Sequence, residues 1–360
     1  MEFNDLNSQY NRIQKNIDRS IAKVLEHGKY IMGPEVFKLE ENLENVTGVN
    51  HVISCANGTD ALVLALMAIG VKKGDAVFCP TFTYFATAEA VAFLGATPVF
   101  IDSEQTGFNL CIADLESQIT QTHREGMLIP KAIIAVDLFG LPVNYKKLTL
   151  IAKKHCLKII EDGAQSFGGK IGDAMAPSFG DIATTSFFPS KPLGCYGDGG
   201  AVFTNNDEYA SIIKSLRVHG KGKHKYDNVR IGMNSRLDTI QAAILIEKLK
   251  ILQDEINERE NISLYYNSIF GDRFEIPIIP EGLKSSWAQY TLLVDNRDEF
   301  RAQLANKGIP TAVYYEKCLH QQQAFLVTGQ KLRKLERAEL LAKTCVSLPM
   351  HVYQERIKFD

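Results

Sequence analysis

Short apolar stretches alternate with helix-like stretches along the first half of the chain, and this alternation constrains the fold more than any other feature. The strand-like stretches are short and apolar, whereas the stretches between them have helical spacing. The strands are expected over residues 51–56, 76–79, 98–101, 132–139 and 157–161, and the helices over 60–69, 84–94 and 145–155. This βαβα rhythm predicts an α/β fold with a mostly parallel sheet covered on both faces.

The rest of the chain predicts further elements and a second, smaller unit. Additional strands are expected over 182–188 and 200–204, and additional helices over 6–27, 208–217 and 237–252. The last of these helices runs into a charged stretch near residue 254, which suggests a domain change. Beyond it, a strand over 289–294 and a helix over 297–307 are enough for a small α+β unit. We therefore expect a large domain over residues 1–254 and a small C-terminal domain over 255–360.

Composition excludes several classes of function. The formal net charge is only −2 at pH 7, so no overall field attracts the chain to nucleic acid or to a membrane surface. The basic run at residues 221–225 is short, and we interpret it as a solvated loop or a phosphate-facing rim. No apolar run reaches the roughly 18 residues of a membrane span, and the N-terminus does not resemble a signal peptide. The seven cysteines include no Cys-x-x-Cys pair, which indicates a reduced, cytoplasmic protein without a metal site.

Lys191 and Asp162 are the strongest candidates for chemistry. Asp162 ends a predicted strand, at the edge where open α/β sheets build their binding sites. Lys191 lies in the run SFFPSKPLG (186–194), a poor position for a helix or strand, and glycines at 197, 199 and 200 allow close backbone approach. A partly desolvated lysine has a lowered pKa, which favours a reactive amine. An amine that forms an imine and a carboxylate that keeps a ring nitrogen protonated are what pyridoxal phosphate (PLP) requires from a protein.

Two strand-to-helix turns offer further contacts for such a cofactor. Asn57-Gly58-Thr59-Asp60 opens a helix, and free N–H groups at a helix N-terminus bind anions. Tyr84 lies at the next such turn, where an aromatic ring stacks on a flat cofactor. Alternatives remain open for both: Asn-Gly-Thr is also common turn chemistry, and aromatic residues more often pack in a core.

In order along the chain, these motifs resemble the sugar aminotransferases of the DegT/DnrJ/EryC/StrS group. The resemblance covers nearly the whole sequence and rests on Gly33-Pro34, NGTDAL (57–62), PTFTY (80–84), EDGAQ (161–165), SFFPSKPLG (186–194), GGA (199–201) and GMNSRL (232–237). It implies the PLP-dependent fold type I, with a large mixed-sheet domain and a small α+β domain. Two positions depart from the group: Asp198 stands where many members have Glu, and Asp137 where many have His.

The resemblance also implies a role for each matching residue. Lys191 forms the imine with the cofactor and moves the proton, and Asp162 pairs with the pyridinium nitrogen. Gln165 contacts the phenolic oxygen of the ring, and Tyr84 stacks on the ring. The phosphate contacts are Gly58, Thr59 and Ser186, with Asn234 supplied by the neighbouring subunit of a homodimer.

For the substrate, segments 222–236 and 309–315, with Leu319-His320, are similar to the branch that acts on UDP-linked 2-acetamido-3-oxo sugars. This implies amino transfer from L-glutamate to C3 of a 3-oxo uronic acid, for O-antigen or other surface polysaccharides. Arg236 would meet the sugar carboxylate from across the dimer, and His320 with Tyr314 would line the sugar pocket. Alternatively, Arg236 braces its loop and Tyr314 is interface packing.

Two rival functions remain at this point. The first is the same chemistry at C4 of a UDP- or dTDP-linked 4-keto-6-deoxy sugar, which would not require Arg236 as a carboxylate partner. The second is a PLP-binding sensor without turnover, although the chain carries no appended DNA-binding or basic tail.

Overall fold

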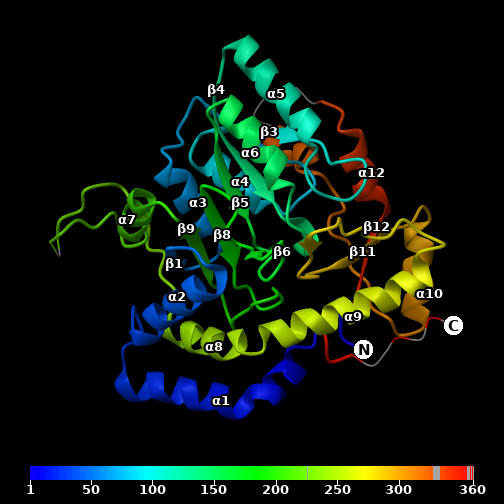
Figure 1. The fold of residues 1–360 in the computed structure, drawn as a ribbon, viewed down its shortest axis with the longest axis horizontal. Coiled ribbons are helices and arrows are strands. Elements are labelled where there is room, and N and C mark those ends of the chain that lie inside the picture. Colours follow the sequence, from blue (N-terminus) through cyan, green and yellow to red (C-terminus); the bar gives the residue numbers. More distant parts are fainter. Residues whose placement is uncertain (225, 327–332, 355–356, 358, 360) are drawn as a thin grey trace.

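A seven-stranded sheet forms the centre of the molecule (Figure 1). The computed structural model describes residues 1–224, 226–326, 333–354, 357 and 359. The strand order is β1-β9-β8-β5-β4-β2-β3, and only β9 runs antiparallel to its neighbours. The strands are β1 (His51–Cys55), β2 (Asp75–Pro80), β3 (Thr97–Ile101), β4 (Ile129–Val136), β5 (Lys158–Asp162), β8 (Ile182–Ser186) and β9 (Gly200–Thr204). The α/β prediction, with its mostly parallel sheet, is confirmed.

Helices cover both faces of this sheet because alternate strand residues are apolar on both sides. One face packs against α3 (Gly58–Ala68), α4 (Ala86–Phe93) and α7 (Asp207–Leu216). The other face packs against α2 (Pro34–Thr47), α5 (Ile112–Glu125), α6 (Tyr145–Lys154) and α8 (Thr239–Leu249). In β4, Ile134 faces the first layer and Ile133 the second, and both are fully buried. Each such side chain stabilises the fold by roughly 1.5–3 kcal/mol.

A second layer of structure follows α8. Helix α9 (Leu252–Phe270) continues the direction of α8 along the lower edge of Figure 1, with α1 (Leu6–His27) beneath them. The paired strands β11 (Tyr290–Leu293) and β12 (Cys345–Leu348) form a separate core with α9 and α10 (Arg297–Asn306). The remaining elements are β6 (Lys170–Ile171), β7 (Ala174–Met175), β10 (Leu283–Lys284), η1 (Leu138–Gly140), η2 (Leu319–Gln321), α11 (Gln323–Leu326) and α12 (Glu336–Thr344).

The division of the chain at residue 254 stays a prediction. That position lies in the first turn of α9, so no linker marks it. Residues after it also pack against the first part of the chain: Leu319 and Leu341 belong to the same core as α3, and β10 pairs with β6. The C-terminal segment therefore both builds its own sheet and covers part of the large one.

Two helices and several boundaries differ from the sequence predictions. Helices α2 and α5 were not predicted, although each ends at a left-handed glycine, Gly48 and Gly126. The strand expected to reach Phe139 ends at Val136, because residues 138–140 turn away as η1. The helix expected to start at Tyr84 begins at Ala86, so that Tyr84 lies in the preceding turn.

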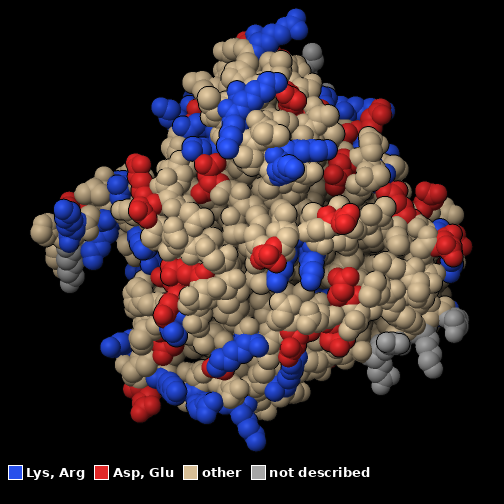
Figure 2. All heavy atoms as spheres, viewed as in Figure 1, with Lys and Arg blue, Asp and Glu red and all other residues tan. Residues whose placement is uncertain are grey.

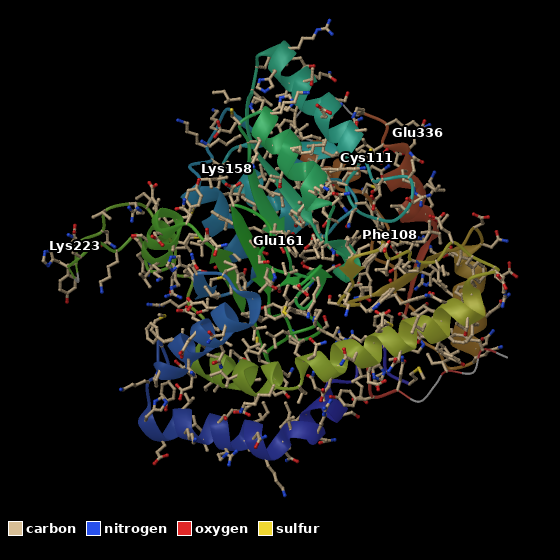
Figure 3. All side chains as sticks on the ribbon, in the orientation of Figure 1. Phe108, Cys111, Lys158, Glu161, Lys223 and Glu336 are labelled. Carbon is tan, nitrogen blue, oxygen red and sulfur yellow. The ribbon has the colours of Figure 1, made fainter. Side chains whose placement is uncertain are left out.

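An arm, residues 218–234, projects from the body between α7 and α8. Isolated bridges between Val218 and Asn234 and between Lys221 and Asn228 hold its two sides together. Figure 2 shows basic side chains along the arm at the left of the view, and Figure 3 places Lys223 near its tip. Residue 225 of the predicted basic run lies outside the described residues. Beyond that run, farther along the arm, Tyr226 and Ile231 are 86% and 89% exposed.

Three general expectations can be compared with the described residues. None of the helices they form is long and apolar enough to cross a membrane. They contain no group of three or more His, Cys, Asp or Glu side chains arranged to hold a metal ion. All seven cysteines are free thiols.

Candidate active site

The predicted cofactor residues meet at one edge of the sheet. The strands β1, β2, β4, β5 and β8 all end there, because β1 runs parallel to β8 although β9 lies between them. A cavity of about 650 Å³ opens at this edge. It is lined by every predicted cofactor residue except Asn234, namely Gly58, Thr59, Tyr84, Asp162, Gln165, Ser186 and Lys191. Their roles stay predictions, but their convergence is a property of the fold.

Lys191 and Asp162 face the same cavity. The N–H of Lys191 donates to the carbonyl of Phe188 at 2.9 Å, which fixes the turn that presents the amine. Burial lowers the pKa of the Lys191 amine, and the negative charge of Asp162 opposes that shift. Burial raises the pKa of Asp162, against hydrogen bonds from Ala164 and Thr87 and the charge of Lys191. The cavity therefore holds a partly desolvated amine and a buried acid, the pairing that imine chemistry on a protonated ring requires.

The turn between β1 and α3 forms an anion-binding end of the cavity. Asn57 caps α3 by accepting a hydrogen bond from the N–H of Asp60 at 2.8 Å. Among the described residues, the N–H groups of Gly58 and Thr59 have no acceptor. A Cβ at Gly58 would lie 2.7 Å from the Cβ of Ser186, so only glycine allows the turn to pack against β8. Free N–H groups, a helix N-terminus and two hydroxyls suit a phosphate.

Gln165 is oriented by the backbone behind the cavity. Its Oε1 accepts from the N–H of Phe139 at 2.6 Å, and its Nε2 donates to the hydroxyl of Tyr315 at 3.2 Å. Tyr84 lies at the mouth with 61% of its surface exposed, and its ring centroid is 6.3 Å from that of Tyr315. A flat ring that stacks on Tyr84 and turns its edge toward Gln165 would gain an aromatic contact from the first and an amide donor from the second.

The substrate residues are placed differently from the cofactor residues. Tyr314 lines the cavity, and its ring also packs against Phe3 at 6.3 Å between centroids. These contacts are compatible both with a role in the sugar pocket and with a packing role. Asn234 and Arg236 lie at the base of the arm and do not line this chain's cavity. Arg236 is half-buried and forms no hydrogen bond or ion pair within the described residues, which disfavours a bracing role through polar contacts.

His320 lies outside the cavity. Its Nδ1 is 2.7 Å from the hydroxyl of Thr81, and its Nε2 is 3.4 Å from Glu339. The imidazole instead lines a separate cavity beside the edge strand β3. The structure therefore does not bring His320 to the predicted sugar pocket, because η2 turns it toward α12.

Three contributing residues were not found by the sequence analysis. Thr87 donates to the Asp162 carboxylate at 3.0 Å, and helical spacing from Tyr84 was the available signal. Tyr315 is adjacent to a predicted residue but was not assigned. Gln289 lines the cavity, and its Oε1 has no donor among the described residues. It directly precedes β11, and no local pattern indicated that this end of the strand would reach the cavity.

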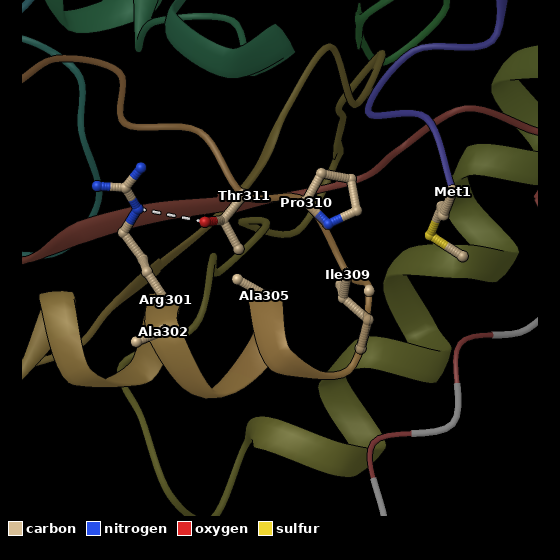
Figure 4. Close-up of a pocket in the computed structure, with 8 residues that line it drawn as sticks. Met1, Arg301, Ala302, Ala305, Ile309, Pro310 and Thr311 are labelled. Carbon is tan, nitrogen blue, oxygen red and sulfur yellow. Dashed lines mark hydrogen bonds between the residues drawn. The ribbon is translucent and has the colours of Figure 1, made fainter.

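A second hollow in the surface lacks the chemical groups of the cavity at the sheet edge. It lies beside α10 and is lined by Met1, Ile309 and Pro310 with a single charged residue, Arg301 (Figure 4). The guanidinium of Arg301 donates to the hydroxyl of Thr311 at 3.2 Å. No acid, nucleophile or helix N-terminus accompanies it among the described lining residues, so this hollow offers no comparable chemistry.

The cavity fits PLP on its own geometry. The glycine cradle and α3 N-terminus suit the phosphate, Lys191 is the amine, and buried Asp162 would face the ring nitrogen. Gln165 and Tyr84 would contact the edge and face of the ring. Each end of the cofactor thus has a chemically matched partner.

Comparisons with known proteins agree with this arrangement. Residues 11–356 match the model of the DegT/DnrJ/EryC1/StrS aminotransferase family. The chain is 46% identical to the UDP-2-acetamido-2-deoxy-3-oxo-D-glucuronate aminotransferase of Pseudomonas aeruginosa, over 98% of this chain and 96% of that protein. It is 39% identical to the UDP-N-acetyl-3-dehydro-alpha-D-glucosamine 3-aminotransferase of Acidithiobacillus ferrooxidans, over 96% and 91%.

A solved structure shows the same fold. The crystal structure of a DegT DnrJ EryC1 StrS aminotransferase from Brucella abortus superposes with a TM-score of 0.96 at 51% identity, covering 98% of this chain and 95% of that one. The family is PLP-dependent, as the cavity predicts. This chain belongs to the DegT/DnrJ/EryC1/StrS aminotransferase family and is a PLP-dependent sugar aminotransferase.

Proposed function

We propose that the chain transfers the amino group of L-glutamate to C3 of a UDP-linked 2-acetamido-2-deoxy-3-oxo sugar, with the uronic acid as the preferred substrate. The observation that carries the chemistry is the cavity that joins a desolvated Lys191 amine to a buried Asp162. The sugar is suggested by the activities of the two relatives, both aminotransferases of 3-oxo UDP-sugars. An amino sugar of this kind would enter O-antigen or another surface polysaccharide.

The residues would divide the work between binding and proton transfer. PLP, when bound, supplies the electron sink for the carbanion that amino transfer generates. Asp162 would hold the ring nitrogen protonated, and Gln165 would donate to the phenolic oxygen. Lys191 would hold the cofactor and then carry the proton at its Nζ. Gly58, Thr59 and Ser186 would hold the phosphate, and Tyr84 would exclude water from one face of the ring.

The charges around the cavity favour a site completed by a second copy of the chain. Lys191 is the only cationic residue among the described residues that line the cavity, whereas Asp162 and Asp198 are acidic. A UDP-sugar brings an anionic diphosphate, which needs cationic partners. Arg230 and Arg236 lie in or beside the arm, whose apolar residues Val229 and Ile231 are exposed. We therefore propose a homodimer in which each arm brings Asn234 and Arg236 to the other subunit's cavity.

Within that homodimer, Arg236 would meet the sugar carboxylate and Tyr314 would line the sugar pocket of its own subunit. The base of the arm is firmly attached, which suits a residue that must select a substrate. The N–H of Ser235 donates to the carbonyl of Arg217 at 3.0 Å, and its hydroxyl accepts from the N–H of Ala56 at 3.2 Å. His320 is not proposed as a direct contact, since it faces Thr81 and Glu339.

An assay with a panel of sugars tests the reaction. Purified protein with PLP and L-glutamate is supplied with UDP- and dTDP-keto sugars generated in situ, and 2-oxoglutarate and the amino sugar nucleotide are measured. Turnover of the UDP-3-oxo sugars, fastest for the uronic acid, is expected. Turnover restricted to 4-keto-6-deoxy sugars would overturn the C3 assignment, and absence of turnover with cofactor bound would favour a sensor.

Mixing two impaired variants tests the shared site. Lys191→Ala and Arg236→Ala subunits are co-refolded or co-expressed. If the residues of one site come from two chains, half of the sites in each mixed dimer are intact, and about one quarter of the wild-type activity on the uronic acid should return. No recovery despite proven mixed dimers would show that each chain completes its own site.

A further inference from the structure

Two fully buried carboxyl groups lie directly behind the cavity. Asp137 follows β4 and Glu161 lies in the neighbouring strand β5, and both are 0% exposed. Figure 3 shows Glu161 near the centre of the molecule. In the described part of the chain their hydrogen-bond donors are all neutral: Val143, Tyr145 and Ser166 for Asp137, and Ser178 and Phe179 for Glu161. Two carboxylates without a basic partner are costly to bury in charged form.

One oxygen of this pair has no donor. The Oε2 of Glu161 accepts from the N–H groups of Ser178 and Phe179, but its Oε1 is buried without a partner among the described residues. Ala135 pairs with Glu161 across the two strands, and Asp137 lies two residues beyond Ala135, so both carboxyl side chains leave the backbone on the same face. A proton on Oε1 would satisfy that oxygen by donation to Asp137, and the pair would then carry one negative charge.

Asp137 also connects to the two residues that would hold the cofactor ring. Its N–H donates to the carbonyl of Asp162 at 3.1 Å, and its Oδ2 accepts from the hydroxyl of Ser166 at 2.9 Å, next to Gln165. Its carbonyl accepts from the N–H of Gly140 and closes the turn whose Phe139 N–H holds the Gln165 amide. A change in the Asp137 side chain would therefore reach both ends of the ring site.

We propose that Asp137 and Glu161 share one proton and act as a positioning pair that holds Asp162 and Gln165 in place for the cofactor ring. This inference rests on the ring-binding roles proposed for Asp162 and Gln165. The single charge matters for Asp162, because a second negative charge behind it would disfavour its ionisation. A protonated Asp162 could not be the counter-ion of a pyridinium. Among the described residues, the other titratable groups that interact with the pair are Tyr145 on α6 and Asp162 itself.

A shared proton makes the stability of the fold depend on pH in a defined direction. Burial raises the pKa of Asp137 to about 7 and raises the pKa of Glu161 well above its ordinary value. Since these folded-state pKa values exceed the unfolded ones, protonation of the pair stabilises the fold fully below about pH 4. The contribution of Asp137 is lost as the pH rises through about 7, and that of Glu161 is lost as the pH rises through its own raised pKa.

Thermal unfolding of the apoprotein tests the proton without using the cofactor. The Glu161→Gln side chain keeps an acceptor for Ser178 and Phe179 and offers a permanent N–H donor to Asp137. Relative to wild type, its unfolding temperature should fall less between about pH 5 and about pH 8. Asp75→Asn is the matched control: Asp75 is also buried, but it begins β2 at the opposite edge of the sheet. This control should keep the wild-type pH profile.

If Glu161→Gln does not fold, infrared spectroscopy of the wild-type apoprotein gives the same information. The carbonyl stretch of a buried protonated carboxyl should be present near pH 7, where ordinary carboxyl groups are ionised. Absence of that band, or a wild-type slope retained in Glu161→Gln, would overturn the shared proton.

The positioning role is tested by cofactor affinity. Asp137→Asn weakens the acceptor for Ser166, so the dissociation constant for PLP should rise about tenfold relative to Asp75→Asn. An unchanged dissociation constant would overturn the positioning role. Failure of the proposed function is distinguishable, because a wild-type protein that binds no PLP would still show the pair in the unfolding and infrared measurements.

Discussion

The cofactor half and the substrate half of the site are built from different kinds of information. Each cofactor residue in the cavity ends a strand, opens a helix or lies in the turn that follows a strand at one edge of the sheet, as Asp162, Gly58 and Lys191 do. The substrate residues come from the arm and from the C-terminal segment, and of these only Tyr314 lines the cavity. The sheet topology of one chain therefore supplies all of the first half except Asn234. The second depends on long-range packing and, in our proposal, on a second chain.

Lys191→Ala should have the largest effect, because no other amine lines the cavity among the described residues. The visible absorbance of protein-linked PLP should disappear, and turnover should fall by about 10⁴-fold or more. Lys158→Ala, which removes a surface lysine paired with Asp181, is the control and should keep both. Retained absorbance in Lys191→Ala would show that Lys191 does not form the imine with PLP.

Asp162→Asn should lower turnover by about 10²- to 10⁴-fold while leaving PLP bound. The amide has nearly the same shape, and its oxygen can still accept from Thr87, but it cannot hold the ring nitrogen protonated. Absorbance titration with PLP and the rate of the glutamate half-reaction separate binding from chemistry. A variant with wild-type turnover would show that Asp162 is structural.

Arg236→Ala sharpens the comparison in the substrate half. Loss of a charged hydrogen bond to the sugar carboxylate should lower kcat/KM for the uronic acid by about 10- to 100-fold. The corresponding neutral sugar should be affected far less, and Arg236→Lys should restore part of the loss. Equal losses for both sugars would mean that Arg236 supports the arm and does not read the carboxylate.

The same comparison explains what the sequence can predict. Lys191, Asp162 and the Asn57–Thr59 turn were identified because strand ends and glycine turns leave local signals. Helices α2 and α5 were missed although they end at left-handed glycines, because their apolar positions were not read as helical faces. Tyr315 and Gln289 carry no local signal, since their place in the cavity depends on how the C-terminal segment packs against the sheet. His320 was expected in the cavity from the resemblance, and the turn at η2 directs it elsewhere.

Thr87→Val should have the smallest effect, and it tests whether the hydrogen bond from Thr87 helps to keep Asp162 ionised. Valine keeps the shape of this buried side chain but removes the hydroxyl that donates to Asp162 at 3.0 Å. A hydrogen bond to the ionised carboxylate lowers its pKa, so its loss should raise the pKa of Asp162 further and reduce turnover about two- to tenfold, most strongly at acidic pH. Thr47→Val removes a similar buried hydroxyl on α2, where Thr47 donates only to the carbonyl of Leu43, and should leave the pH–rate profile unchanged. If Thr87→Val also leaves that profile unchanged, the ionisation of Asp162 does not depend on its own hydrogen bonds, and the charge of the bound cofactor alone must keep it negative.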